Sequence, residues 1–191
     1  TFNFAKTGTQ TFTKSAGTIS GNQLFNINSG AVVDFGTNIL DGATGGFTLA
    51  SGGGIITANT NTTGALTTSG TNGTIQVTGT RTYNTGADYT FSGASAQVAG
   101  NGFTGSRNLT ISNTTGLKLA ASTAATVTGT LSLSGDLDIN ANTLTLNSAA
   151  AAQSITGSAS SRQITSTGNG IVSLTGSGAH TITVSSLTGL T

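Results

Sequence analysis

Five residue types are missing from this chain of 191 residues: cysteine, methionine, tryptophan, proline and glutamate. The absence of cysteine fits oxidising and reducing compartments equally, so it says nothing about location. The absence of proline favours β-sheet, because each proline removes a hydrogen-bond donor from a strand ladder. His180 is the only histidine, and it lacks the second histidine or cysteine that a zinc site or a nucleophilic triad needs. We therefore interpret His180 as a surface residue of a strand.

Charge is also scarce, at 6% of residues against about 25% in typical soluble domains. The six basic residues are scattered, so the chain lacks the basic patch that nucleic-acid binding requires. No apolar stretch approaches the roughly 20 residues that span a bilayer, and no signal peptide is visible. Disorder is the alternative, but disordered chains combine low hydrophobicity with high net charge. Here the net charge is +1 and 35% of residues are hydrophobic, which favours a folded domain.

The acidic residues are five aspartates: Asp34, Asp41, Asp88, Asp136 and Asp138. Glycoside hydrolysis needs two placed carboxylates, and solenoid polysaccharide lyases concentrate acidic and basic groups in one groove. Asp34 and Asp41 are close in sequence, but we interpret both as corner residues. The sequence therefore predicts neither an enzyme nor a bound cofactor.

The stretch SGDLDINAN contains a candidate metal site. Asp136, Asp138 and Asn140 alternate with Leu137 and Ile139, so on a strand the three polar side chains share one face. Calcium takes about six to eight oxygen ligands, for which two carboxylates are a thin shell. Asp136, Asp138 and Asn140 are thus a weak calcium candidate.

What the chain does contain is alternation. Apolar residues recur at every second position in short runs bounded by Gly, Asn and Ser, as in Phe2/Phe4, Leu131/Leu133 and Leu144/Leu146. Period-two alternation is typical of strands, and no window shows the i, i+3, i+4 apolar spacing with caps that is typical of a helix. The enrichment in Thr, Val and Ile points the same way. The sequence predicts an all-β fold.

The apolar runs also repeat along the chain, in two interleaved series with a step of about 21 residues, and periods of this size mark solenoids. The first series is Phe2, Phe25, Phe47, Leu66, Tyr89, Leu109, Leu131, Ile155 and Val172. The second series is Phe12, Val33, Ile55, Ile75, Val98, Leu117, Leu137, Ile164 and Ile182. We expect one parallel β-solenoid over residues 1–191, with roughly nine coils. Stacking of equivalent positions also explains the low charge, because stacked like charges repel.

Two distant stretches nearly repeat each other, TGTQTFTK at 7–14 and TGTRTYNT at 78–85, and we call this pair the echo. We interpret the two stretches as parts of a duplicated block of about three coils. The polar stretch 57–73 has a single apolar side chain larger than alanine, and we expect it to be a looped-out insertion that shifts the register. The first residue is threonine and the last residues read as continuing repeat, so we expect an internal slice of a longer chain.

The stretches NLTISNTTGLKL (108–119), VTGTLSLSG (127–135) and DLDINANTLTLN (136–147) resemble the repeats of very large secreted bacterial surface proteins. Nearly the whole chain is similar in style to the β-solenoid adhesins grouped with filamentous haemagglutinin. It is closer still to the giant repetitive surface proteins that gliding and predatory bacteria export by the type IX route. The resemblance implies a right-handed β-solenoid, an extracellular or cell-surface location, and contact with surfaces or other cells. It supplies no catalytic residues.

Three functional hypotheses follow. The first is a structural rod segment of a bacterial adhesin or extracellular fibre, which we expect to self-associate because open solenoid ends carry unpaired strand edges. The second is ice binding by Thr-x-Thr units, although their spacing does not follow one face; they lie at 11–13, 80–82, 128–130, 143–145, 165–167 and 181–183. The third is a glycan-binding module that uses Tyr83 and Tyr89 as aromatic platforms, although Tyr89 alternates with Phe91 and fits the core better.

Overall fold

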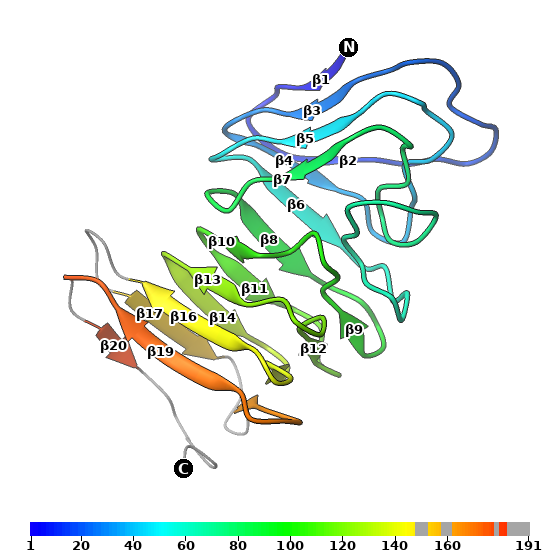
Figure 1. Cartoon of the computed structure of the whole chain (residues 1–191). Helices are drawn as coiled ribbons and strands as arrows, with labels where there is room; N and C mark the ends of the chain where they lie inside the picture. Colours follow the sequence, from blue (N-terminus) through cyan, green and yellow to red (C-terminus); the bar gives the residue numbers. More distant parts are fainter. Residues whose placement is uncertain (148–152, 158–161, 178–179, 183–191) are drawn as a thin grey trace.

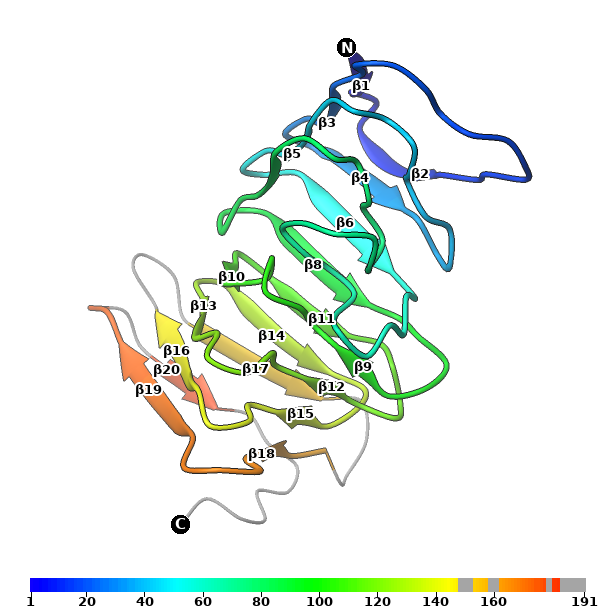
Figure 2. The same ribbon diagram turned by 45° about the vertical axis from the view of Figure 1, so that its right-hand side comes forward.

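The computed structural model of the chain describes residues 1–147, 153–157, 162–177 and 180–182. These residues form twenty strands and no helix, so the predicted all-β fold is confirmed. The strands stack in parallel, coil upon coil, into a three-sided β-solenoid (Figures 1 and 2). Within the described ranges, no helix has the length and apolarity needed to cross a membrane.

One sheet runs through the whole described stack, and we call it the spine sheet. Every neighbouring pair in it is parallel. Its eight strands, in spatial order, are β2 (Gly8–Thr11), β4 (Ala31–Asp34), β6 (Gly54–Thr57), β8 (Asp88–Phe91), β11 (Leu109–Ile111), β14 (Thr130–Leu133), β17 (Gln153–Gly157) and β20 (His180–Ile182).

Three shorter sheets complete the other sides. The N-terminal side sheet contains β1 (Phe2–Phe4), β3 (Phe25–Ile27), β5 (Phe47–Leu49) and β7 (Arg81–Tyr83). The C-terminal side sheet contains β10 (Gly105–Ser106), β13 (Ala125–Val127), β16 (Thr143–Asn147) and β19 (Ile171–Thr175). The short sheet contains β9 (Gln97–Val98), β12 (Leu117–Lys118), β15 (Leu137–Asp138) and β18 (Ile164–Thr165).

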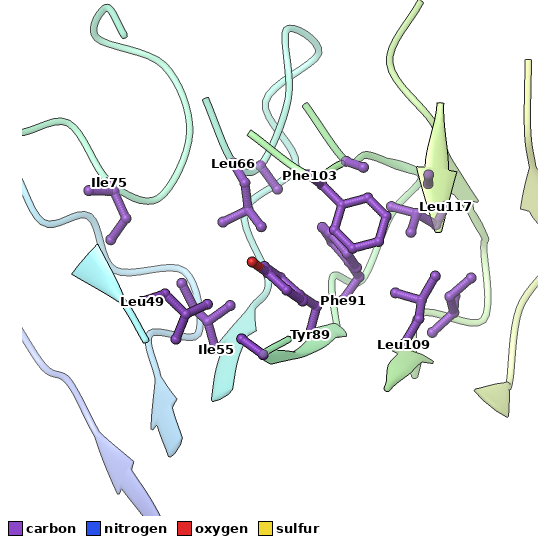
Figure 3. Packing of buried hydrophobic residues seen from close by; sticks show 14 of the residues in the cluster. Leu49, Ile55, Leu66, Ile75, Tyr89, Phe91, Phe103, Leu109 and Leu117 are labelled. Atoms are coloured by element: carbon purple, nitrogen blue, oxygen red, sulfur yellow. The ribbon is translucent and has the colours of Figure 1, made fainter. Parts of the chain in front are cut away.

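The core is a set of columns in which equivalent inward residues of successive coils stack. The longest column belongs to the spine sheet and consists of Val33, Ile55, Tyr89, Leu109, Leu131 and Ile155. All six are buried, since strand alternation turns every second side chain inward. Figure 3 shows Tyr89 and Leu109 in this column, packed with Phe91 and Phe103 from the same region. The Tyr89 and Phe103 rings meet edge to face at 5.2 Å.

The predicted columns are partly confirmed. Phe2, Phe25 and Phe47 stack as expected, as do Leu117, Leu137 and Ile164. Other members were misplaced: Arg81 rather than Leu66 follows Phe47, Gln10 rather than Phe12 precedes Val33, and Ile182 rather than Val172 follows Ile155. Ile75 pairs with Leu40 instead of following Ile55. Tyr89 and its successors continue the column of Ile55. Between residues 55 and 89 the first series therefore moves from the N-terminal side sheet to the spine sheet, and the second series moves from the spine sheet to the short sheet.

The exchange of sides has a local cause, which is a coil of unusual length. The step from Ile55 to Tyr89 is half as long again as the step from Val33 to Ile55. The extra chain lies between β6 and β7, and we call residues 58–80 the excursion. The stretch 57–73 falls largely within it, and Ala65 and Leu66 there are fully buried.

The number of coils was overestimated. The eight strands of the spine sheet correspond to about seven turns, not nine. Three coils exceed the roughly 21 residues of the sequence period by the most. They are the coil from Ile55 to Tyr89, the coil from Leu131 to Ile155 and the coil from Ile155 to Ile182.

The interpretation of the echo as duplicated coils was wrong. Gln10 lies in β2 of the spine sheet, where it pairs with Val33. Its counterpart in the echo, Arg81, lies in β7 of the N-terminal side sheet, where it pairs with Phe47. The two segments therefore occupy different sides of the solenoid, because a Thr-rich alternating sequence fits a strand on either side.

Gln97 corrects a further register assignment. The sequence placed Val98 in the column of Leu117, but Leu117 pairs with Gln97 and Val98 pairs with Lys118. Gln97 is buried because its amide is fully paired: Nε2 donates to the carbonyls of Thr57 (3.2 Å) and Asn59 (2.9 Å), and Oε1 accepts from the Gly93 N–H (2.7 Å) and Asn113 Nδ2 (3.0 Å). A buried amide with all its hydrogen bonds made can occupy a position that otherwise takes leucine.

The excursion approaches the following coil so closely that Gly100 has no room for a side chain. A Cβ at Gly100 would lie 2.1 Å from the Leu66 carbonyl oxygen, and its φ of +92° already disfavours other residues. We predict that Gly100→Ala lowers the free energy of unfolding by about 2 kcal/mol or more. The matched control is Gly17→Ala, which has a φ of +84° but no atom within 4 Å. Equal losses in urea denaturation would contradict the close approach.

Candidate interaction surface

The outer face of the spine sheet carries a ladder of hydroxyl groups. In the register of the sheet, Thr90, Thr110, Ser132 and Thr156 stack directly, one per coil, and we call these four residues the hydroxyl ladder. All four are at least partly exposed, because their neighbours along each strand point into the core. Adjacent parallel strands lie about 4.8 Å apart, so the hydroxyls form a regular row along the solenoid.

A shallow depression of about 370 Å³ adjoins this ladder. Val32 and Ile56 form its apolar part, and Asp88, Thr90 and Thr110 form its polar part. Gly54 lies between them, and a Cβ there would come within 3.0 Å of Val32 Cγ2. The glycine therefore keeps the depression open.

The two charged side chains beside the depression pair with each other. The Arg107 guanidinium forms a two-pronged ion pair with Asp88, from Nε to Oδ1 (2.9 Å) and from Nη2 to Oδ2 (2.6 Å). Asp88 Oδ1 also accepts from the backbone N–H (3.2 Å) and Nδ2 (2.9 Å) of Asn108. The hydrogen bond to Asp88 raises the pKa of Arg107. An exposed pair of this kind contributes little to stability, about 0–1 kcal/mol, but it cancels both charges; Asp34 at the end of β4 adds one acidic side chain to the same face.

The Thr-x-Thr units that suggested an ice-binding array lie on several sides. Thr80 and Thr82 lie at the N-terminal side sheet, Thr143 and Thr145 in the C-terminal side sheet, and Thr165 in the short sheet. None of the four residues of the hydroxyl ladder belongs to these units. Each of its members directly follows a residue of the predicted column of Tyr89, Leu109, Leu131 and Ile155, so the ladder was predictable from that column, but the pattern Thr-x-Thr does not identify it.

The two tyrosines considered as glycan platforms are both packed. Tyr89 is buried in the spine-sheet column, and its hydroxyl donates to the Asn84 carbonyl (2.8 Å). The Tyr83 ring packs on Phe47 at 5.6 Å, and its hydroxyl donates to the Thr67 carbonyl (3.3 Å). Burial raises the pKa of both phenols well above the usual value. Neither ring lies free on the surface for a sugar to stack on.

The calcium candidates lie where β15 meets the next corner. Leu137 and Ile139 point inward, and Asp138 and Asn140 are partly exposed, as the alternation predicts. Asp138 Oδ1 accepts from the N–H groups of Asn140 (2.7 Å) and Thr167 (3.1 Å), and its Oδ2 lies 3.4 Å from Lys118 Nζ.

Asp136 is engaged separately, because its Oδ1 accepts from the Gln163 N–H (3.1 Å). The two aspartates thus face hydrogen-bond donors rather than a common point. In the parts of the chain that the structure describes, no three His, Cys, Asp or Glu side chains gather as a metal site would require. The side chain of His180 lies outside the described residues.

No protein-family model, no curated protein and no solved structure matches this chain. The fold defines its class, a parallel β-solenoid. The likeness to exported adhesins rests on the sequence stretches 108–119, 127–135 and 136–147.

The contacts of Asp138 make the stability of the fold depend on pH. Burial opposes its ionisation, but the donors from Asn140 and Thr167 and the Lys118 ammonium outweigh burial, so the pKa of Asp138 is lowered. A lowered folded pKa stabilises the fold at pH values above the unfolded value of about 3.9, and this contribution disappears as pH falls through the folded pKa. We predict that wild type exceeds Asp138→Asn in Tm from pH 5 to 8, and that the difference shrinks below about pH 4. A difference that grows on acidification would contradict this account.

Proposed function

We propose that this chain is a structural rod segment of a bacterial cell-surface adhesin or extracellular fibre, without catalytic activity. The observation that carries the proposal is the spine sheet, an unbroken parallel ladder through every described coil. Each added coil lengthens such a stack by about 4.8 Å. The packing of the existing coils does not change, because each coil contacts only its neighbours. The seven turns correspond to about 34 Å of rod. The resemblance to exported surface repeats supports the same function and location.

Self-association belongs to this proposal, and the outer face of the spine sheet is the contact surface that we propose for it. The hydroxyl ladder is small and regular, and the Asp88–Arg107 pair cancels the nearest charges. Two such faces meet with little repulsion, since weakly charged surfaces promote association. Val32 and Ile56 add apolar area beside the open depression at Gly54.

A pair of matched double variants tests this function. Thr110→Lys with Ser132→Lys places two cations on the outer face of the spine sheet. Thr48→Lys with Thr82→Lys places two cations on the exposed face of the N-terminal side sheet. In sedimentation and electron microscopy we expect wild type and the side-sheet variant to form elongated assemblies, and the spine-sheet variant to stay monomeric. Compact monomers of wild type at every concentration would overturn the proposal.

Ice binding is the second candidate, and the hydroxyl ladder is the observation that favours it. A row of threonine and serine side chains at a constant spacing can order water on a flat face. If this is the function, wild type shows thermal hysteresis, and the spine-sheet double variant loses it while the side-sheet variant keeps it. Wild-type solutions without hysteresis exclude this candidate and leave the rod function untouched.

A further inference from the structure

The excursion is a folded layer inserted between two coils. Its return arm (73–80) continues the side of the preceding coil at 40–45, and its Ile75 points into the core (Figure 3). The bonds are Leu40 N–H to Thr74 O (2.8 Å), Gln76 N–H to Leu40 O (2.7 Å), Thr78 N–H to Ala43 O (3.0 Å) and Gly79 N–H to Gly45 O (3.0 Å). The return arm thus belongs to the N-terminal part of the stack, by which we mean the coils up to and including β7; the C-terminal part begins with β8.

The other arm of the excursion belongs to the C-terminal part. This descending arm (64–67) bonds to the following coil at 98–102, through Ala65 N–H to Val98 O (2.8 Å), Leu66 N–H to Ala99 O (2.9 Å) and Gly102 N–H to Leu66 O (2.9 Å). Leu66 lies fully buried beside Phe103 (Figure 3). The two arms meet where the Thr74 N–H donates to the Ala65 carbonyl (2.8 Å).

This layer matters because the side sheets are interrupted at the same level. The N-terminal side sheet ends at β7, the C-terminal side sheet begins at β10, and the short sheet begins at β9. Among the described strands, the pairing of β6 with β8 is the single strand pair that joins the two parts. The excursion therefore provides the remaining backbone connection between them.

Arg81 fastens the two arms together. It occupies the column position that Phe2, Phe25 and Phe47 fill in earlier coils, and its side chain points inward with only 6% of the residue exposed. Nε donates to the Val77 carbonyl in the return arm (2.9 Å). Nη1 donates to both the carbonyl (3.2 Å) and the hydroxyl (3.0 Å) of Thr67 in the descending arm, and Nη2 donates to the Gly70 carbonyl at the tip.

Tyr83 strengthens the same contact from the next inward position of β7. Its hydroxyl donates to the Thr67 carbonyl, which also accepts from Arg81. Its ring contacts the following coil so tightly that a Cβ on Gly102 would lie 2.7 Å from the ring carbons. Arg81 and Tyr83 thus bind one strand of the N-terminal part to the arm that pairs with the C-terminal part.

We propose that Arg81 is a coupling residue: by fastening the excursion it makes the coils that end with β7 and the coils that begin with β8 unfold as one cooperative unit. A buried guanidinium is costly unless its donors are paired, so it holds its acceptors in one arrangement. Its four acceptors come from both arms and the tip, so the guanidinium fixes the positions of these three segments relative to one another. Without the guanidinium, each part of the stack keeps its own columns, and the excursion no longer holds them together.

Hydrogen exchange measured by mass spectrometry on the whole chain tests the coupling. Arg81→Met keeps the aliphatic stem and removes every donor. We expect amides of 64–67 and 73–80 to exchange at least about tenfold faster, because hydrogen bonds from a charged group are lost. We expect amides of β3 and β5 to follow them, while those of β11, β14 and β16 stay within about threefold of wild type.

Two further variants keep the test decisive. Arg107→Met removes an exposed arginine from a surface ion pair, and we expect no acceleration within 58–80. Thr67→Val removes one acceptor of Arg81 together with the hydrogen bond from the Thr67 hydroxyl to the Asn72 carbonyl (2.7 Å), and we expect it to give the same pattern more weakly if Arg81→Met does not fold. Unchanged exchange in the excursion, or an equal acceleration in all coils, would overturn the proposal.

Discussion

The structure depends on the stacking of equivalent positions in successive coils, about 4.8 Å apart. Whatever a coil places at one position meets its counterpart above and below, so identical apolar residues stack well and like charges do not. The column of Lys118 shows the rule, because this cation is stacked between Val98 and Asp138 and forms an ion pair with the latter. The chain as a whole avoids the problem by carrying only 6% charged residues.

This constraint is visible in the sequence, which is why the fold class could be predicted. Alternation and a regular spacing of apolar runs require neither a template nor a long-range contact to recognise. From Tyr89 to Leu131 the coils differ little in length, and the predicted column through Leu109, Leu131 and Ile155 is correct. Before Tyr89 the predicted register is wrong at the excursion. Leu66 is buried and lies at the spacing expected of the next column residue after Phe47, but that position belongs to Arg81.

The candidate surface was not predicted, although the register that forms it was. Each member of the hydroxyl ladder directly follows a residue of the correctly predicted column, but threonine suits any strand surface, so the sequence does not single these residues out. Arg81 gave a local signal, a charged residue at the first inward position of an alternating strand with Tyr83 at the next. That signal identifies an unusual position but not the carbonyl groups that satisfy it, because those come from 67–77 and depend on how the excursion folds.

The spine sheet keeps its strands paired one by one while the length of chain per coil varies widely, from the short coil between Tyr89 and Leu109 to the long one between Ile55 and Tyr89. The additional residues leave and rejoin the stack between β6 and β7, on the sides away from the spine. The rise per coil is therefore independent of how much chain each coil contains. A protein built on this plan can exchange its corner segments for others of different size and chemistry, and so display them at a fixed axial spacing, without any change in the strands that hold it together.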